Sequence, residues 1–205
     1  MKPLQMPMFS PETEWIPPTH LPDLKDHKEI AIDLETRDPG LKSSGSGSVN
    51  GNGEVVGIAV AVEGWSGYFP IAHEGGGNMD RALVLDWFEE VLHTDATKIF
   101  HNAMYDVSWI RSMGFYIRGG VIDTLIAASL IDENRWGYAL NALGKQYVGV
   151  GKNEKILNDA AKSWGIDPKA DMWRLPAPLV GEYAEQDAVL TLRLWHALQR
   201  EISSQ

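Results

Sequence analysis

The order of strand-like and helix-like segments constrains the fold of this chain more than any other feature. Alternating and apolar runs predict strands at residues 29–35, 54–62, 67–71 and 98–101, with a hairpin turn near 63–66. Helical periodicity follows at residues 78–93, 102–113, 123–131, 138–148, 153–164 and 179–201. A strand meander, then a strand–helix pair, then helices is typical of an α/β layer fold with a mixed sheet.

The length of 205 residues fits one domain with a sizeable core. Residues 1–27 are expected to form an irregular lead-in, because proline blocks regular elements at six positions: Pro3, Pro7, Pro11, Pro17, Pro18 and Pro22. The folded domain is then expected to span residues 28–205. Within it, residues 36–53 are rich in glycine and serine and predict a long flexible loop.

Composition narrows the classes of function. The chain has no cysteine, which excludes a disulfide scaffold, a thiolate metal site and a cysteine nucleophile. Its longest apolar stretch, residues 55–62, is far too short to span a membrane, and the N-terminus lacks a signal-peptide core. We therefore expect a cytoplasmic protein with no membrane partner.

The formal net charge of −10 disfavours a protein that coats DNA passively. The charge is uneven, however: residues 1–100 carry a balance of −9, whereas residues 101–205 carry −1. A protein that binds phosphate through divalent metal ions also needs acidic ligands. The acidic composition is therefore compatible with a metal-dependent nuclease.

Three acidic patterns fall on predicted elements. Asp33 and Glu35 lie two residues apart near the end of a strand, so their side chains share one face and can share a hard cation. Asn102 and Asp106 lie four residues apart in the first turn of a helix, with Asn102 placed as its N-cap. Tyr183 and Asp187 are likewise four residues apart on the last helix.

Each pattern alone has a simpler explanation, such as an acidic turn, a helix cap or an amphipathic helix face. Their combination and order resemble the DEDD superfamily of 3′–5′ exonucleases. The histidine subgroup carries histidine five residues before the last aspartate, where this chain has Glu182; Tyr183 matches the tyrosine subgroup. Residues 33–40 look like those of bacteriophage family A DNA polymerases, so the chain resembles the proofreading domain of such a polymerase.

The resemblance implies a ribonuclease H-like mixed sheet flanked by helices, and a two-metal 3′–5′ exonuclease that releases nucleoside 5′-monophosphates from single-stranded DNA. It implies that two Mg²⁺ ions, replaceable by Mn²⁺, are held by carboxylates. The implied ligands are Asp33, Glu35, Asp106 and Asp187. Tyr183 would orient the nucleophile, which completes the implied catalytic set.

The resemblance also implies contacts with the terminal nucleotides at Thr36, Asn102 and Tyr105, and a DNA polymerase domain or subunit as a partner. Two alternatives stay open at this point. One is an RNA exonuclease similar to RNase D, and the other is a non-catalytic nucleic-acid-binding module. His73 and His101 have no second histidine at ligand spacing, so a zinc site is not expected.

Overall fold

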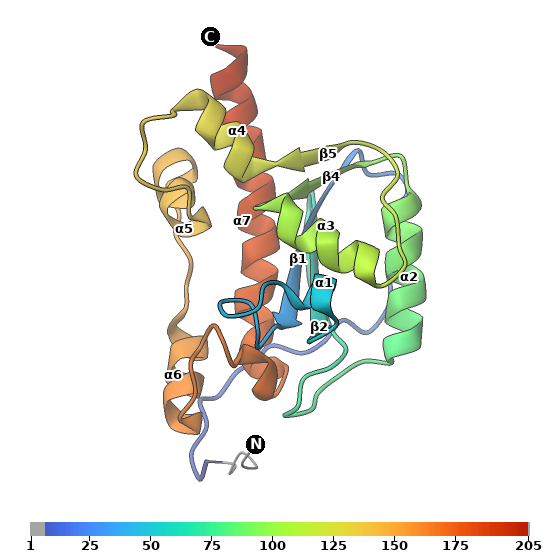
Figure 1. Cartoon of the computed structure of the whole chain (residues 1–205), viewed down its shortest axis with the longest axis vertical. Helices are drawn as coiled ribbons and strands as arrows, with labels where there is room; N and C mark the ends of the chain where they lie inside the picture. The colour runs from blue at the N-terminus through green and yellow to red at the C-terminus, as the bar shows by residue number, and fades with distance from the viewer. Residues whose placement is uncertain (1–6, 205) are drawn as a thin grey trace.

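The structure, a computed structural model, describes residues 7–204, and residues 1–6 and 205 lie outside the described residues (Figure 1). The elements are, in chain order, β1 (Glu29–Arg37), α1 (Gly47–Asn50), β2 (Glu54–Val62), β3 (Trp65–Pro70), α2 (Arg81–His93), β4 (Thr97–Phe100), α3 (Ala103–Ser112), β5 (Val121–Asp123), α4 (Thr124–Ile131), α5 (Leu140–Leu143), the π-helix η1 (Gly144–Val148), α6 (Lys155–Trp164), the 3₁₀-helix η2 (Met172–Arg174) and α7 (Pro178–Ser203).

The five strands form one mixed sheet in the order β3-β2-β1-β4-β5. β1 pairs antiparallel with β2 and parallel with β4, so it lies at the centre of the sheet. The α/β architecture with a mixed sheet and flanking helices, predicted from the sequence, is therefore confirmed. The strand β5, only three residues long, was not predicted.

The two faces of the sheet have different helical covers (Figure 1). Ile30, Ile32 and Leu34 of β1 point into a core that includes side chains of α2 and α3. Ala31, between them, points to the opposite face, where the core includes side chains of α6 and α7. Because side chains alternate along a strand, Asp33 and Glu35 follow Ala31 onto the α7 face.

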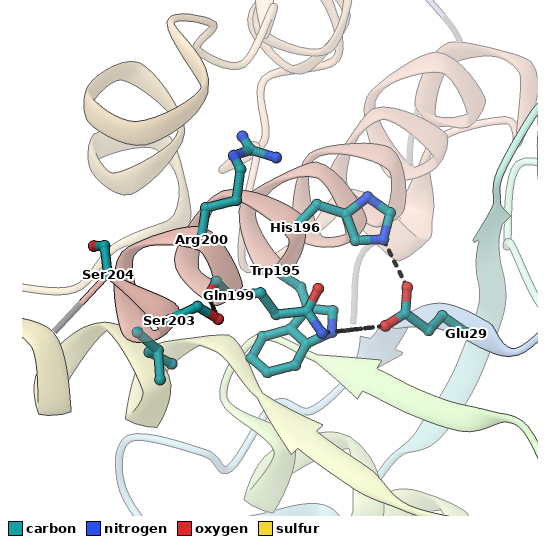
Figure 2. A pocket seen from close by; sticks show the side chains of 8 residues that line it. Glu29, Trp195, His196, Gln199, Arg200, Ser203 and Ser204 are labelled. Carbon is teal, nitrogen blue, oxygen red and sulfur yellow. Dashed lines mark hydrogen bonds and ion pairs between the residues drawn. The ribbon is translucent and has the colours of Figure 1, made fainter.

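The beginning of β1 is fastened to the C-terminal half of α7 (Figure 2). The Glu29 carboxylate accepts a hydrogen bond from Trp195 Nε1 at 3.0 Å and pairs with His196 Nε2 at 2.7 Å. Gln199 Nε2 adds a longer bond at 3.5 Å. These contacts fix α7 against the central strand at the end of the sheet opposite to Asp33 and Glu35.

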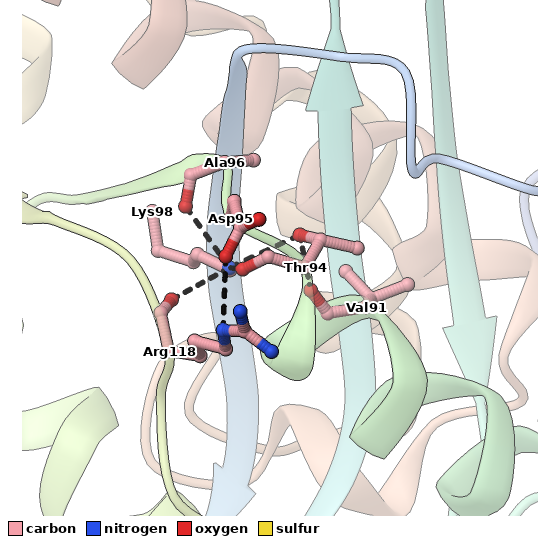
Figure 3. A network of polar contacts seen from close by, with 6 residues as sticks. All are labelled: Val91, Thr94, Asp95, Ala96, Lys98 and Arg118. Atoms are coloured by element: carbon pink, nitrogen blue, oxygen red, sulfur yellow. Dashed lines mark hydrogen bonds and ion pairs between the residues drawn. The ribbon is translucent and has the colours of Figure 1, made fainter.

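On the opposite face of the sheet, the fully buried Lys98 of β4 links several segments through hydrogen bonds (Figure 3). Lys98 Nζ donates to the carbonyl oxygens of Thr94, Ala96 and Arg118 at 2.5, 3.0 and 2.8 Å. Burial lowers the pKa of Lys98 to about 8. An ammonium group has only donors, and these carbonyl oxygens accept its hydrogen bonds. The bonds link the end of α2 to the start of β4.

The glycine- and serine-rich segment, residues 36–53, contains regular structure that its composition does not predict. Thr36 and Arg37 belong to β1, and the helical turn α1 follows, capped by Ser46, whose side chain accepts from the Ser48 N–H. Gly47 lies so close to Trp109 of α3 that an added Cβ would come within 3.0 Å of the indole ring. The flexible loop predicted over residues 36–53 thus includes the end of β1 and the helical turn α1, and its flexibility stays a prediction.

None of the helices in residues 7–204 combines the length and apolar character that a membrane span requires.

Candidate active site

The central strand delivers two carboxylates to the α7 face of the sheet. Asp33 pairs in register with Ala59 of β2, and Glu35 pairs with Gly57. These two neighbours on β2 are small, and the phenol group of Tyr68 occupies the place that a side chain at Gly57 would take. The register of β1 and β2 then shifts by one residue between Glu35 and Thr36. Such irregularities re-aim side chains near functional sites.

The long helix α7 brings the third carboxylate to the same place. Asp187 is 5% exposed and belongs to a helix face otherwise buried against the sheet. One carboxylate oxygen from each of Asp33, Glu35 and Asp187 lies within 4.8 Å of the others. Asp33 and Asp187, 154 positions apart along the chain, thus lie close together, as the family resemblance implied. The buried Tyr183 lies one turn earlier on α7.

Burial raises the affinity of all three carboxylates for protons, and neighbouring carboxylates add to this effect at Asp33 and Glu35. Burial raises the pKa of Asp33 well above its usual value, and the charges of Glu35 and Asp187 raise it further. Burial and the charge of Asp187 raise the pKa of Glu35 to about 8. Burial also raises the pKa of Asp187, against the opposing effect of Lys152. In the absence of metal the cluster therefore retains protons, because its surroundings do not compensate the charge of three ionised carboxylates.

Asp106 lies beside this cluster and is held by the central strand. Its Oδ1 accepts a hydrogen bond from the Leu34 N–H at 3.0 Å, between the two acidic residues of β1. Burial raises the pKa of Asp106 to about 7. Its charge in turn raises the pKa values of Asp33 and Glu35. Asp106 is not one of the three carboxylates whose oxygens lie within 4.8 Å of one another.

The donor set fits divalent metal ions. Carboxylate oxygens are the ligands that Mg²⁺ prefers. Asp187 Oδ1 is buried and has no hydrogen-bond partner among the described residues. A buried charged oxygen without a partner is costly, and a bound cation would satisfy it. Asp33, Glu35 and Asp187 can therefore hold a divalent cation, with Asp106 near enough to influence the site.

Thr36 and Tyr105 are joined at the edge of the acidic cluster. Their hydroxyl oxygens lie 2.7 Å apart, and the Tyr105 hydroxyl donates to Asp38 Oδ2 at 3.0 Å. Since Tyr105 has one proton, Thr36 donates to Tyr105 in this chain of bonds. Burial raises the pKa of Tyr105 to about 12, which keeps it protonated.

Asn102 begins α3, but it does not cap the helix as predicted. Its backbone adopts the left-handed conformation with φ of 67°, unlike any other non-glycine residue described, and its side chain makes no capping bond. Asp123 supplies the cap instead: its carboxylate accepts from the N–H groups of Asn102 and Ala103 at 2.9 and 2.8 Å. The prediction failed because the cap comes from a distant strand, and the exposed Asn102 side chain remains available for a ligand.

Sequence patterns missed two neighbours of the cluster. Lys152 Nζ lies 2.7 Å from Asp187 Oδ2, yet nothing around Lys152 in the sequence marks it. Tyr68 is fully buried, and the carboxylates of Glu35 and Asp33 are near enough to help raise its pKa.

The ring of His73 determines the direction of the hydrogen bond of the Tyr68 hydroxyl. Burial lowers the pKa of His73 to about 4, so the ring is neutral. His73 Nδ1 lies 3.1 Å from the Leu175 carbonyl oxygen and must donate to it, which leaves Nε2 as an acceptor. The Tyr68 hydroxyl, 2.6 Å from Nε2, therefore donates to His73 and not to the acidic cluster. Both ring nitrogens of His73 thus take part in hydrogen bonds within the protein.

Comparison with known proteins places this geometry in a family. The family model described as 3′–5′ exonuclease, of family A DNA polymerases, matches residues 18–203. A DNA-directed DNA polymerase of Pseudomonas phage M6 is 38% identical over 98% of this chain and 32% of its own length. DNA polymerase DpoZ of Salmonella phage PMBT28 is 29% identical over 90% of this chain and 28% of its own length. The chain thus spans about a third of the length of these curated relatives.

Solved structures agree in fold. RNase D of Trypanosoma brucei superposes with a TM-score of 0.63 at 17% identity, covering 85% of this chain and 58% of the other. Brucella melitensis NrnC with bound Mg²⁺ gives 0.59 at 20% identity, covering 92% and 80%. At these identities the likeness concerns the fold alone. On the family match and the phage relatives, this chain belongs to the 3′–5′ exonuclease family of the family A DNA polymerases.

Proposed function

We propose that this chain removes nucleotides one at a time from the 3′ end of single-stranded DNA and releases nucleoside 5′-monophosphates. The observation that carries the proposal is the buried trio of Asp33, Glu35 and Asp187, with oxygens within 4.8 Å of one another and one of them without a partner. The phage relatives named as DNA polymerases support DNA as the substrate.

Two Mg²⁺ ions, replaceable by Mn²⁺, complete the proposed site. Asp33 would contribute to both, Glu35 and Asp187 would hold the first, and Asp106 would hold the second. When bound, the two ions supply electrostatic stabilisation to the attacking and the departing oxygen of a phosphodiester. When metal ions displace the protons that the raised pKa values retain, the four ionised carboxylates balance the four positive charges of two divalent ions, and the loaded site can accept the phosphate of DNA.

Tyr183 acts on the nucleophilic water through its hydroxyl group. Burial and the nearby charge of Asp187 raise the pKa of Tyr183 well above its usual value. The phenol therefore stays protonated at every working pH and is not the general base. Its role is to orient the water for in-line attack on the terminal phosphodiester, as a hydrogen-bond partner at a fixed position.

The terminal nucleotides lie against Thr36, Asn102 and Tyr105 in this proposal. Asn102 supports it best, because its side chain is exposed and makes no capping bond, while its backbone takes the left-handed conformation that asparagine tolerates well. Its exposed amide can donate to or accept from a base or a sugar. Thr36 directly follows the metal ligand Glu35, so the nucleotide would lie beside the metal ions.

We further propose that a DNA polymerase domain or subunit presents the 3′ end to this site. The phage relatives are about three times longer than the aligned region, and their names describe polymerases. The charge balance of −1 over residues 101–205 leaves few free cations to follow a DNA backbone. We therefore expect the isolated domain to bind DNA weakly and to cleave distributively.

Digestion of 5′-labelled single strands tests the proposed substrate. DNA and RNA of one sequence are incubated separately with Mg²⁺ and then with excess chelator. We expect a ladder that shortens from the 3′ end of DNA, mononucleotide products, and no cleavage with chelator. Faster digestion of RNA would make the chain an RNA exonuclease, and the absence of cleavage on both substrates would overturn the proposed activity.

A further inference from the structure

Lys152 lies between η1 and α6, and its side chain reaches into the acidic cluster. Nζ lies 2.7 Å from Asp187 Oδ2, and the two side chains are only 13% and 7% exposed. Lysine is rarely so buried unless it is paired. Its charge also lowers the pKa values of Asp33 and Glu35, so it acts on the whole carboxylate trio.

Hydrogen bonds to side chains of α5 and α7 hold the backbone around Lys152. The Lys152 N–H donates to Asn141 Oδ1 at 2.9 Å, which ties it to α5. The next N–H, of Asn153, donates to Gln186 Oε1 at 2.9 Å, which ties it to α7 beside Asp187. Gly151 packs so closely that an added Cβ would lie 2.8 Å from Asn141 Oδ1. The position of Lys152 is therefore set by the fold.

The two oxygens of Asp187 have different surroundings. Oδ2 is paired with Lys152, whereas Oδ1 is buried and has no partner among the described residues. A carboxylate can bind an ammonium through one oxygen and a metal ion through the other. Lys152 thereby fixes the rotation of the Asp187 carboxylate and leaves Oδ1 for a cation.

Lys152 also sets the direction of the Tyr183 hydroxyl group. Nζ lies 3.4 Å from Tyr183 Oη and 5.1 Å from the centre of its ring. Because an ammonium group only donates, Tyr183 Oη must accept from Lys152. The single phenolic proton then points away from Lys152, and the Asp187 carboxylate is close enough to accept it, since a hydrogen bond from Tyr183 helps to lower the pKa of Asp187.

We propose that Lys152 is a positioning residue of the exonuclease reaction, which holds Asp187 through Oδ2 and orients the Tyr183 hydroxyl as a donor. The inference rests on the proposed function. It differs from a second reading, in which Lys152 only occupies the place of a metal ion and leaves when the ion binds. The two readings disagree about turnover when the metal is saturating.

The test compares Lys152→Met with a matched control, Lys155→Met. Lys155 lies on α6, is 80% exposed and pairs with Asp159, so it lacks any contact with the cluster among the described residues. Mn²⁺ affinity is measured by calorimetry without DNA, and kcat and KM on single-stranded DNA at saturating Mn²⁺. Lys152→Gln replaces Lys152→Met if circular dichroism shows that the latter does not fold.

We expect Lys152→Met to bind Mn²⁺ about 3- to 10-fold more tightly, because a positive charge has left the cluster. We expect its kcat to fall about 10- to 100-fold with KM unchanged, because Tyr183 and Asp187 lose their orientation. Lys152→Arg should recover most of the lost kcat, and Lys155→Met should behave like the wild type. In the Tyr183→Phe background, Lys152→Met should lower kcat much less, because the two residues act together.

Three results would overturn the inference. Unchanged kcat at saturating Mn²⁺ would show that Lys152 only occupies a metal position. Weaker Mn²⁺ binding together with a lower melting temperature would show a merely structural role. Full additivity of the Lys152 and Tyr183 variants would show that the two residues act separately. If instead the wild type has no metal-dependent nuclease activity, the proposed function fails first.

Discussion

The Glu29 carboxylate on β1 and the His196 imidazole on α7 lie 2.7 Å apart, at the end of both elements that is remote from the acidic cluster. From Glu29 to Asp33 the strand advances four residues, about 13 Å at ~3.3 Å each. From His196 back to Asp187 the helix advances nine residues, about 13 Å at ~1.5 Å each. The two paths have equal length, so this contact sets the register that places Asp187 opposite Asp33.

Replacing Glu29 therefore affects a site about 13 Å away. Glu29→Ala removes the acceptor of the Trp195 and His196 bonds, which costs about 1–3 kcal/mol and lowers the melting temperature by about 2–10 °C. We expect weaker Mn²⁺ binding by calorimetry as α7 loses its register. Glu63→Ala, at an exposed turn position, is the control. Unchanged Mn²⁺ affinity in Glu29→Ala would show that other contacts fix α7.

Tyr183→Phe separates the hydroxyl group from the packing of the ring. The ring stays buried against the sheet, so the melting temperature and the Mn²⁺ affinity should remain near those of the wild type. Turnover should fall about 100-fold, because the group that orients the nucleophile is lost. Single-turnover digestion with saturating Mn²⁺ measures the effect. A wild-type rate would reduce Tyr183 to a packing residue.

The stability of the metal-free domain should depend on pH through the acidic cluster. Because burial raises the pKa of Glu35 to about 8 and that of Asp106 to about 7, the folded state holds protons that the unfolded state releases. Their contribution to stability is present below the ordinary carboxyl pKa values near 4 and is lost as pH rises toward 8. Thermal denaturation in chelator from pH 5 to 8 follows this loss.

The matched variant is Glu35→Gln, which cannot ionise and should show a shallower fall in melting temperature over the same range. Excess Mg²⁺ should stabilise the wild type more at pH 8 than at pH 5, because metal ligands must be deprotonated. Parallel curves for the wild type and Glu35→Gln would contradict the pKa of Glu35 given above.

The glycine-rich segment after β1 should be sensitive to a single methyl group. In Gly47→Ala the new Cβ would overlap the backbone carbonyl of Asn52 and press against Trp109. Overpacking of this kind costs about 1–3 kcal/mol, or about 2–10 °C in melting temperature. Gly137→Ala, where a Cβ meets nothing within 4 Å, is the control. Equal melting temperatures would support the mobile loop that composition predicts.

The parts of the site that follow from periodicity were predictable from the sequence. Two-residue spacing places Asp33 and Glu35 on one strand face, and the amphipathic pattern of the last helix places Asp187 on its buried side. Periodicity alone did not predict contacts between distant segments. Asp123 caps α3 from a three-residue strand, and Lys152 reaches Asp187 from a glycine-flanked connection without periodicity.

The packing of residues 36–53 was missed for a related reason. Composition records how freely glycine and serine move in an unfolded chain, but it does not record which neighbours they meet in a fold. Ser48 bonds to Ser108, and Gly47 N–H donates to Asp38 Oδ1, through contacts that only the tertiary structure creates. Whether this segment moves when DNA binds stays a prediction.

We expect Asp33, Glu35 and Asp187 to hold the divalent ions on which exonuclease activity depends. The most direct test is one Mn²⁺ titration in which calorimetric occupancy and the rate of single-stranded DNA digestion are measured side by side for the wild type and Asp33→Asn. We predict that the wild-type rate rises with Mn²⁺ occupancy and vanishes in chelator, and that Asp33→Asn stays folded but loses both binding and several orders of magnitude in rate. Digestion by the wild type in chelator, or a near-wild-type rate in folded Asp33→Asn, would contradict it.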